Sequence, residues 1–184
     1  MHFNFHVELN DKDYFDYNTF WMNKSPYGKK RILILRILIV AIFSVAAFAS
    51  LFKKEPSYDI LIIKTILYAI AVILYELLLK PFLTFNLKHN IKARKKIGEL
   101  GYSPVSEIEF YDESFIEIRP NSKTEQKYTL VERLSVISDK AIYIHVNKTM
   151  SLSYILPLSC FESKEQYHNF LEFMKDKGIS IDVY

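Results

Sequence analysis

Cys160 is the only cysteine in the chain, and two histidines, His145 and His168, lie on either side of it in the sequence. A thiol can act as a nucleophile when a neighbouring imidazole removes its proton. Leu158 and Phe161 flank Cys160, however, and a lone cysteine among apolar residues is usually a small buried hydrophobe. The sequence therefore predicts that Cys160 is not catalytic and that the chain is not an enzyme.

The candidates for metal or cofactor binding are equally sparse. Asp11, Asp13 and Asp16 resemble the start of a calcium loop, but the glycine and the distal glutamate of such a loop are missing. The histidines, His2 and His6 among them, do not have the spacing of a metal site. With four glycines in total, the chain has no glycine-rich phosphate loop. We predict no metal site and no cofactor.

Two further charged residues, Arg36 and Glu76, lie within long apolar runs, Ile32–Phe52 and Ile60–Leu79. Each run has about 20 residues, and a helix of that length spans roughly 30 Å, the thickness of the hydrocarbon core of a bilayer. We therefore predict two transmembrane helices that form a hairpin over residues 32–85. In this hairpin Arg36 and Glu76 fall at similar depth, where either they form an ion pair or Arg36 extends alone to the lipid headgroups.

Lysine and arginine residues set the expected orientation, because they remain preferentially on the cytoplasmic side. They gather before the first run and after the second, whereas the connection holds only Lys53 and Lys54. The flanking residues are Lys24, Lys29, Lys30 and Arg31 before the first run, and Lys80, Lys88, Lys92, Arg94, Lys95 and Lys96 after the second. Both termini are thus predicted to be cytoplasmic, with residues 53–59 outside.

A basic helix is predicted to continue over residues 86–101. Four lysines share one of its faces: Lys88, Lys92, Lys95 and Lys96. Each basic residue near an anionic bilayer surface contributes about 1 kcal/mol of attraction. This face therefore predicts contact with anionic lipid, although simple anchoring of the topology explains it as well. Gly101 ends the element, and Pro104 prevents its continuation.

The first 31 residues form a separate cytoplasmic segment in this interpretation. Alternation of apolar and polar residues from Phe3 to Val7 predicts a short strand. Asn10 or Asp11 can then cap a helix over Lys12–Met22. This helix is rich in aromatic residues, and it either lies in the membrane interface or packs on the C-terminal domain.

Apolar residues alternate with a period of two from Val105 onward, which predicts a β-rich domain over residues 102–184. Strands are expected around Ile108 and Ile116 and over Tyr128–Ser138, Ala141–Val146 and Leu152–Leu156. Polar turns are expected at Pro120–Thr124, Asp139–Lys140 and Asn147–Lys148. Together these segments predict a meander of about five strands.

An amphipathic helix is expected after the strands. Ser163 and Gln166 form a capping box at its start, and Gly178 ends it before a short strand over Ile179–Val183. Its apolar stripe consists of Tyr167, Phe170, Leu171 and Met174. Because the helix must bury this stripe against the sheet, we predict an α+β domain: a curved antiparallel sheet closed by a C-terminal amphipathic helix. This is the layout of a pleckstrin-homology-like (PH-like) module.

The order of the segments, with KDYFDYNTFW near the N-terminus and YILPLSCF before the last helix, resembles the YcxB-like family of bacterial membrane proteins. The most specific element is Ile155-Leu156-Pro157 followed by Phe161. The sequence departs from the family pattern at Leu156, before the proline, and at Leu158, where a basic residue is often found. The resemblance covers essentially the whole chain. It implies a membrane-anchored PH-like domain at a bacterial inner membrane, and it implies no activity.

The formal net charge of +3 is too small to indicate nucleic-acid binding, and the basic residues lie at the ends of apolar runs. We predict a multi-pass protein of the bacterial cell membrane that presents a small cytoplasmic binding or regulatory domain at the inner leaflet. The alternative is an accessory or immunity-type protein that acts through its transmembrane hairpin. The expected partners are the bilayer and either anionic lipid or a protein, and a homo-oligomer fits both functions.

Overall fold

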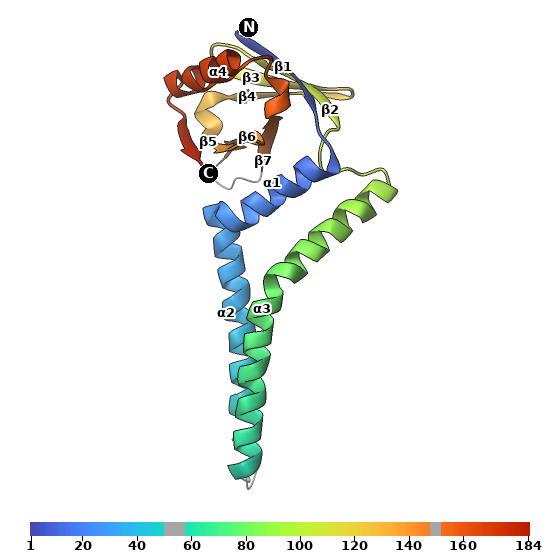
Figure 1. Cartoon of the computed structure of the whole chain (residues 1–184), viewed down its shortest axis with the longest axis vertical. Helices are drawn as coiled ribbons and strands as arrows, with labels where there is room; N and C mark the ends of the chain where they lie inside the picture. The colour runs from blue at the N-terminus through green and yellow to red at the C-terminus, as the bar shows by residue number, and fades with distance from the viewer. Residues whose placement is uncertain (50–57, 148–151) are drawn as a thin grey trace. The chain divides into compact units, whose positions relative to one another are not determined.

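The computed structural model describes residues 1–49, 58–147 and 152–184 (Figure 1). The structure is mixed α+β, as the sequence predicts, and it divides into two compact units. We call the first unit the β domain; it contains residues 1–18 and 94–184. The second, the helical unit, contains residues 19–93.

The elements follow one another in this order: β1 (Phe3–Glu8), α1 (Asp11–Lys24), α2 (Pro26–Ala49), α3 (Tyr58–Lys96), β2 (Val105–Phe110), β3 (Ser114–Arg119), β4 (Ser122–Lys127), β5 (Val131–Ile137), β6 (Ala141–Val146), β7 (Leu152–Pro157), α4 (Lys164–Asp176) and β8 (Ser180–Val183). Two short 3-10 helices, η2 (Tyr128–Leu130) and η3 (Leu158–Cys160), follow β4 and β7. Most of the predicted outer connection, including Lys53 and Lys54, and Lys148 of a predicted turn lie outside the described residues.

Two four-stranded sheets form the β domain. In sheet A the strand order is β1-β2-β3-β4, and all neighbours are antiparallel. In sheet B the order is β7-β6-β5-β8, with β8 parallel to β5. The period-two alternation explains the strands, because Phe5, Ile108 and Phe110 are almost fully buried between the sheets while the residues beside them face outward.

β1 completes sheet A although residues 9–104 separate it from β2 in the chain. The two strands pair along their whole length, from Phe3 opposite Phe110 to Glu8 opposite Val105. The alternation over Phe3–Val7 predicts a strand in a separate N-terminal segment, because alternation does not identify the partner of a strand. In the structure the β domain is therefore built from chain segments on both sides of the helical unit.

α4 buries the apolar stripe that the sequence predicts. Phe170 and Met174 are fully buried. The Phe170 ring contacts the rings of Phe5 and Phe110 at centroid distances of 5.2 and 5.0 Å. Edge-to-face aromatic pairs of this kind add to the free energy gained by burying apolar area. The helix thus joins the core at the position where β1 and β2 meet.

The predicted ends of α4 are also present. Ser163 Oγ accepts a hydrogen bond from the Gln166 N–H at 3.1 Å, and Gln166 Oε1 accepts one from the Glu162 N–H at 2.8 Å. Gly178 has a φ of 78°, a left-handed conformation that ends helices and favours glycine. These local signals are sufficient to define the helix.

Two details of the sheets differ from the prediction. The predicted turn over Pro120–Thr124 is shorter, because Ser122–Lys127 pairs with β3 as the edge strand β4. Its side chains are polar on both faces, so it shows no apolar alternation. The predicted strand over Tyr128–Ser138 begins only at Val131, since η2 precedes it.

The helical unit begins with the end of α1 and a tight connection into α2. Ser25 is buried, and its Oγ accepts a hydrogen bond from the Gly28 N–H at 2.8 Å, as an N-cap residue does. Pro26 occupies the first helical position, where a missing N–H costs nothing. A Cβ at Gly28 would lie 2.2 Å from the Trp21 carbonyl oxygen, so this close approach requires glycine. α2 therefore starts before the apolar run.

α3 has 39 residues and contains Pro81. A helix of that length measures about 58 Å, well beyond the thickness of a hydrocarbon core. Proline removes one backbone hydrogen bond and bends a helix, and α3 changes direction along its course (Figure 1). The predicted basic helix over residues 86–101 is the last part of this element rather than a separate helix, and it ends at Lys96.

α2 and α3 contact each other through an ion pair and a pair of aromatic rings. Arg36 Nε lies 3.0 Å from Glu76 Oε2, and the rings of Phe43 and Tyr68 lie 6.3 Å apart. Within the described residues, one segment, Ile62–Lys96, is long and apolar enough to cross a membrane, with a mean hydropathy of 2.1 in its most apolar stretch of 18 residues. The predicted first span, Ile32–Phe52, extends past the described part of α2.

Candidate functional site

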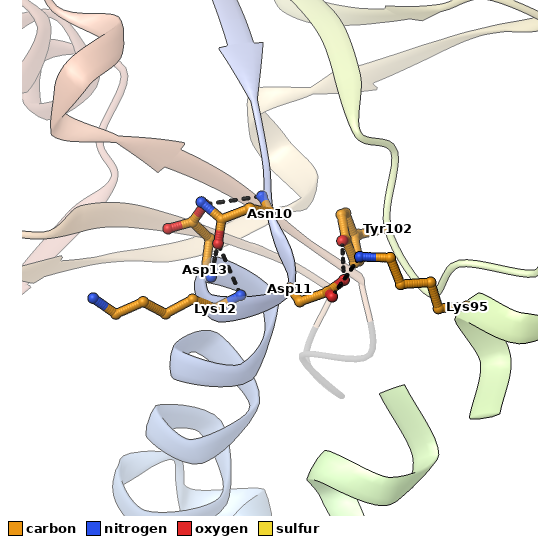
Figure 2. Close-up of polar contacts among 6 residues, drawn as sticks. All are labelled: Asn10, Asp11, Lys12, Asp13, Lys95 and Tyr102. Carbon is orange, nitrogen blue, oxygen red and sulfur yellow. Dashed lines mark hydrogen bonds and ion pairs between the residues drawn. The ribbon is translucent and has the colours of Figure 1, made fainter. Parts of the chain in front are cut away.

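A polar cluster lies where the chain leaves β1 and where it re-enters the β domain after α3 (Figure 2). We call this cluster the Asp11 junction; it consists of Asn10, Asp11, Asp13, Lys95 and Tyr102. All five residues belong to the β domain. The backbone closes the same region, because the Leu9 N–H donates to the Pro104 carbonyl at 2.8 Å.

The start of α1 is capped by its own side chains. Asn10 Oδ1 accepts hydrogen bonds from the N–H groups of Lys12 and Asp13, at 2.8 and 3.2 Å. Asp13 Oδ2 in turn accepts one from the Asn10 N–H at 3.0 Å. This reciprocal arrangement is a capping box, and it satisfies the donors that a helix N-terminus leaves open. The N-terminus of α1 is therefore occupied by acidic and amide oxygens, which disfavours a bound anion.

Asp11 connects the two chain segments of the junction. Its Oδ2 accepts a charge-assisted hydrogen bond from Lys95 Nζ at 2.7 Å, and its Oδ1 accepts one from Tyr102 Oη at 2.6 Å. Lys95 and Tyr102 together lower the pKa of the Asp11 carboxyl. Burial and the Asp11 carboxylate raise the pKa of Tyr102 to about 12, so this phenol stays a proton donor at neutral pH.

Aromatic packing holds the junction together. The rings of Tyr14 and Tyr102 lie 5.1 Å apart. A Cβ at Gly101 would lie 2.5 Å from Tyr14 Oη, so a larger residue at position 101 would require the Tyr14 side chain to move. Beside these contacts is a cleft of about 530 Å³, lined by Leu9, Asn10, Asp11, Lys12, Lys95, Leu100, Tyr102 and Pro104. The junction is thus a packed contact with a shallow cleft at its side.

The chemistry of the junction favours a structural role in positioning chain segments. Asp11 is already neutralised by Lys95, and Tyr102 directs its hydroxyl to the same carboxylate. A general base needs a free lone pair toward the substrate, and a phosphate site needs uncompensated positive charge. What the arrangement can do is hold residues 9–13 against residues 95–104.

The three aspartates that resemble the start of a calcium loop have different partners in the structure. Asp11 binds Lys95 and Tyr102, Asp13 caps α1, and Asp16 Oδ2 lies 3.3 Å from Lys140 Nζ. In the part of the chain that the structure describes, no group of three or more histidine, cysteine, aspartate or glutamate residues is arranged to hold a metal ion.

The predicted basic face is divided by these contacts. Lys88, Lys92, Lys95 and Lys96 are all exposed near the end of α3. Lys95 nevertheless directs its ammonium group to Asp11, and so it is engaged within the protein. Contact with anionic lipid remains a prediction for the other three lysines, Lys88, Lys92 and Lys96.

Cys160, His145 and His168, the residues considered for thiol chemistry, each have an environment that does not favour a reactive thiol–imidazole pair. Burial raises the pKa of the Cys160 thiol to about 11, which disfavours the nucleophilic thiolate. His145 on β6 is fully buried, and its two ring nitrogens lie 3.0 and 2.9 Å from the hydroxyls of Ser153 and Ser135. The ring of His168 lies against that of Tyr167.

Acidification tests the role of His145. Burial lowers its pKa to about 4, with Arg133 adding to the effect and Asp182 opposing it. The unfolded chain takes up this proton near pH 6.5 and the folded chain does not, so stability falls as the pH drops from 6.5 to about 4. The loss contributed by His145 is expected to be about 3 kcal/mol. It is measured as the difference in pH dependence between the wild type and His145→Gln, both full-length in detergent micelles.

His6 supplies the control for this measurement. Hydrogen bonds to Glu107 and Glu8 raise the pKa of His6, so His6 stabilises the fold below pH 6.5 and acts with the opposite sign. Substituting His6→Gln should therefore preserve the acid-induced loss. An unchanged pH profile in His145→Gln would show that His145 does not carry the effect.

The Asp11 junction is tested by Asp11→Asn, which removes the charge and keeps the size of the side chain. Because the folded pKa of Asp11 is lowered, its contribution to stability is present above its ordinary value near 3.8 and is lost as the pH falls through the folded pKa. The variant should melt at a lower temperature than the wild type at neutral pH, and the difference should vanish in acid. Tyr102→Phe, which loses one of the two donors, should show a smaller decrease. A constant difference at all pH values would contradict this account.

Sequence reasoning identified Asp11 and Lys95 but assigned them to other roles, and it did not identify Tyr102. The available signal was an acidic cluster before the apolar runs and a basic cluster after them, which suits a contact between the two flanks.

Comparisons with models of protein families, with curated proteins and with solved structures found no match.

Proposed function

We propose that this chain is a multi-pass membrane protein of the bacterial cell membrane, related to the YcxB-like family. In this proposal a transmembrane hairpin of α2 and α3 holds a PH-like β domain at the cytoplasmic leaflet. The domain acts as a binding or regulatory module toward lipid headgroups or a protein partner, and not as an enzyme. Both termini are cytoplasmic.

The pairing of β1 with β2 is the observation that carries this proposal. Because the two strands lie on opposite sides of residues 9–104, both ends of the helical segment connect into one folded sheet. A hairpin brings both of its ends to the same side of a bilayer, as this connection requires. A single-span protein would place β1 and β2 on opposite sides, where they could not pair.

The surface of the helical unit supports a membrane environment. Large apolar side chains of both helices are exposed, among them Ile37, Ile42, Val45, Ile66, Ile73 and Leu77. Soluble proteins rarely expose apolar patches of this extent, and a bilayer would cover them. The most apolar window of Ile62–Lys96 is only 6% buried, whereas the core helix of a soluble protein is mostly buried, and this difference supports the proposal.

The topology of the β domain supports a PH-like module. Strands β1 to β4 form one antiparallel sheet, β5 to β7 form most of the second, and the amphipathic helix α4 follows. β8 adds a parallel edge strand to this layout. The membrane segment then lies between the first two strands of the module, as a large insertion.

Partner capture from bacterial membranes tests whether the β domain or the transmembrane hairpin binds the partner. In one variant an unrelated two-helix anchor of equal length replaces residues 32–85 and leaves the β domain unchanged. In the other the native helices remain, and Phe170→Asp disrupts the core of the β domain. The proposal expects a partner or anionic lipid held by the wild type to be kept by the first variant and lost by the second. The opposite result would favour an accessory or immunity-type protein that acts through its hairpin.

A further inference from the structure

The free edge of sheet A has a charge pattern that is complementary to itself. Within the described residues β4 pairs only with β3, and it carries the sequence Ser-Lys-Thr-Glu-Gln-Lys over Ser122–Lys127. An edge strand presents unpaired N–H and C=O groups and can add another strand. We propose that β4 pairs antiparallel with β4 of a second copy of this chain, which joins two sheets A into one continuous sheet.

The backbone of β4 identifies the residues that face the open edge. The last pair of the β3–β4 ladder is Ser114 opposite Lys127. In the next pair along the chain, the Tyr128 N–H donates a hydrogen bond to the Glu113 carbonyl, so Tyr128 and Glu113 are a hydrogen-bonded pair. Hydrogen-bonded and non-hydrogen-bonded pairs alternate along antiparallel strands. Even-numbered residues of β4 therefore direct their backbone groups to β3, and Lys123, Glu125 and Lys127 direct theirs outward.

Charge and the length of strand overlap together select one register for the second copy. A two-fold axis at Thr124 places Thr124 opposite Thr124 and places Lys123 opposite Glu125 twice, on the outer face of the sheet. Shifting the axis by one residue toward Lys127 puts Glu125 opposite Glu125, and shifting it the other way puts Lys123 opposite Lys123. Oppositely charged cross-strand pairs stabilise a sheet, whereas like charges destabilise it. Of these three registers, only the first places opposite charges against each other, and it leaves Lys127 opposite Asn121. An axis at Gln126 would also place Glu125 opposite Lys127, but it would overlap only residues 125–127 of the two β4 strands, whereas the axis at Thr124 overlaps residues 122–126.

The same register satisfies the backbone. Lys123 and Glu125 of facing copies become hydrogen-bonded pairs, and the two-fold axis generates each pair twice. Lysines on an edge strand usually discourage pairing with other strands. Here each Lys123 meets a glutamate, so the edge disfavours basic strands and accepts a copy of itself. This inference depends on sheet A alone and does not require the proposed binding function.

Disulfide formation tests the register in the full-length protein. In a Cys160→Ala background, Thr124→Cys places two cysteines at a non-hydrogen-bonded pair with Cα atoms about 4.5 Å apart, a distance that a disulfide spans. Ser122→Cys, on the same strand and the same face, places them about 13 Å apart. In membranes under mild oxidation, the cross-linked dimer should form at least about five-fold more with Thr124→Cys. Equal yields from the two variants would overturn the proposed register.

Charge reversal tests the pairing without a cross-link. Lys123→Glu and Glu125→Lys should each weaken dimerisation roughly ten-fold, measured by sedimentation of full-length protein in detergent micelles. An equimolar mixture of the two variants, and the variant that carries both changes, should each recover the dimer, because every facing pair is again opposite in charge. Glu125→Lys also removes the 2.6 Å hydrogen bond from Ser114 Oγ, so Lys123→Glu is the cleaner single change. A dimer unaffected by either change, or a mixture that does not recover, would refute self-pairing through β4.

Discussion

Replacing Phe5 with alanine is expected to lower the free energy of unfolding of the β domain by about 3–5 kcal/mol, the range observed for large aromatic residues in cores. Phe5 is 1% exposed, and its ring lies 4.7 Å from that of Phe161 and 5.2 Å from that of Phe170. A typical domain is stable by about 5–15 kcal/mol, so this change removes a large part of the total. The measurement is protease resistance of the β domain over a denaturant series, in the full-length protein.

Asn4→Ala is the matched control, because Asn4 lies on the same strand and points away from the core. It should change the free energy of unfolding by less than about 0.5 kcal/mol, as surface substitutions usually do. If Phe5→Ala has as little effect as Asn4→Ala, β1 does not contribute to the core of the domain.

A pair of soluble fragments isolates the contribution of the whole strand. Residues 105–184 alone lack β1, so they leave the edge of β2 open and the core without Phe5 and Val7. Joining residues 1–9 to residue 104 through a short glycine-rich linker restores the pair, since Leu9 and Pro104 already contact. The joined fragment should be more stable and less prone to aggregate than residues 105–184. Equal behaviour would contradict the assignment of β1 to this domain.

The second large effect is expected at the ion pair of the helical unit. Arg36 Nε lies 3.0 Å from Glu76 Oε2. Within a bilayer, removing one partner leaves the other charge uncompensated, which costs about 2–4 kcal/mol. Arg36→Leu and Glu76→Leu should each destabilise the packing of α2 against α3 by this amount. The measurement is the loss of helix packing in bicelles as SDS is added.

The reciprocal exchange distinguishes pairing from the alternative in which Arg36 reaches the headgroups alone. Arg36→Glu combined with Glu76→Arg restores opposite charges and should recover most of the stability that the single changes remove. Lys64→Met on α3 is a control, because the proposed topology puts Lys64 near the outer membrane surface, away from Arg36 and Glu76. If the exchange recovers nothing, Arg36 and Glu76 act independently.

Local signals in the sequence predicted much of the architecture. Ser163, Gln166 and Gly178 determine both ends of α4, and its apolar stripe determines which face is buried. Alternation predicted β6 with the bounds that the structure shows, and it predicted β1 as a strand. The mixed α+β class follows from the apolar period of two in the strands and the helical spacing of the apolar stripe in α4. Each of these features depends on residues within a few positions of one another, so the sequence alone contains the information.

Edge strand β4 and the true start of β5 were not predicted, because their formation does not depend on an apolar pattern. The side chains of β4 are polar on both faces, and pairing with β3 alone makes this segment a strand. The start of β5 is set by η2, where the Tyr128 hydroxyl donates to the Tyr111 carbonyl at 2.8 Å. In both cases the deciding contact lies in another segment of the chain, on β3 for β4 and in the connection between β2 and β3 for η2.

The sequence by itself determined that the chain contains membrane-length apolar runs and a β-rich domain with a terminal helix, because composition and period are local properties. Only the tertiary structure decided that β1 belongs to that domain and that Asp11 binds Lys95 and Tyr102. Those partners lie 84 and 91 positions away along the chain. A strand or a carboxylate can be predicted from its neighbours, whereas its partner depends on how distant segments meet, and many pairings satisfy the same pattern until the core selects one.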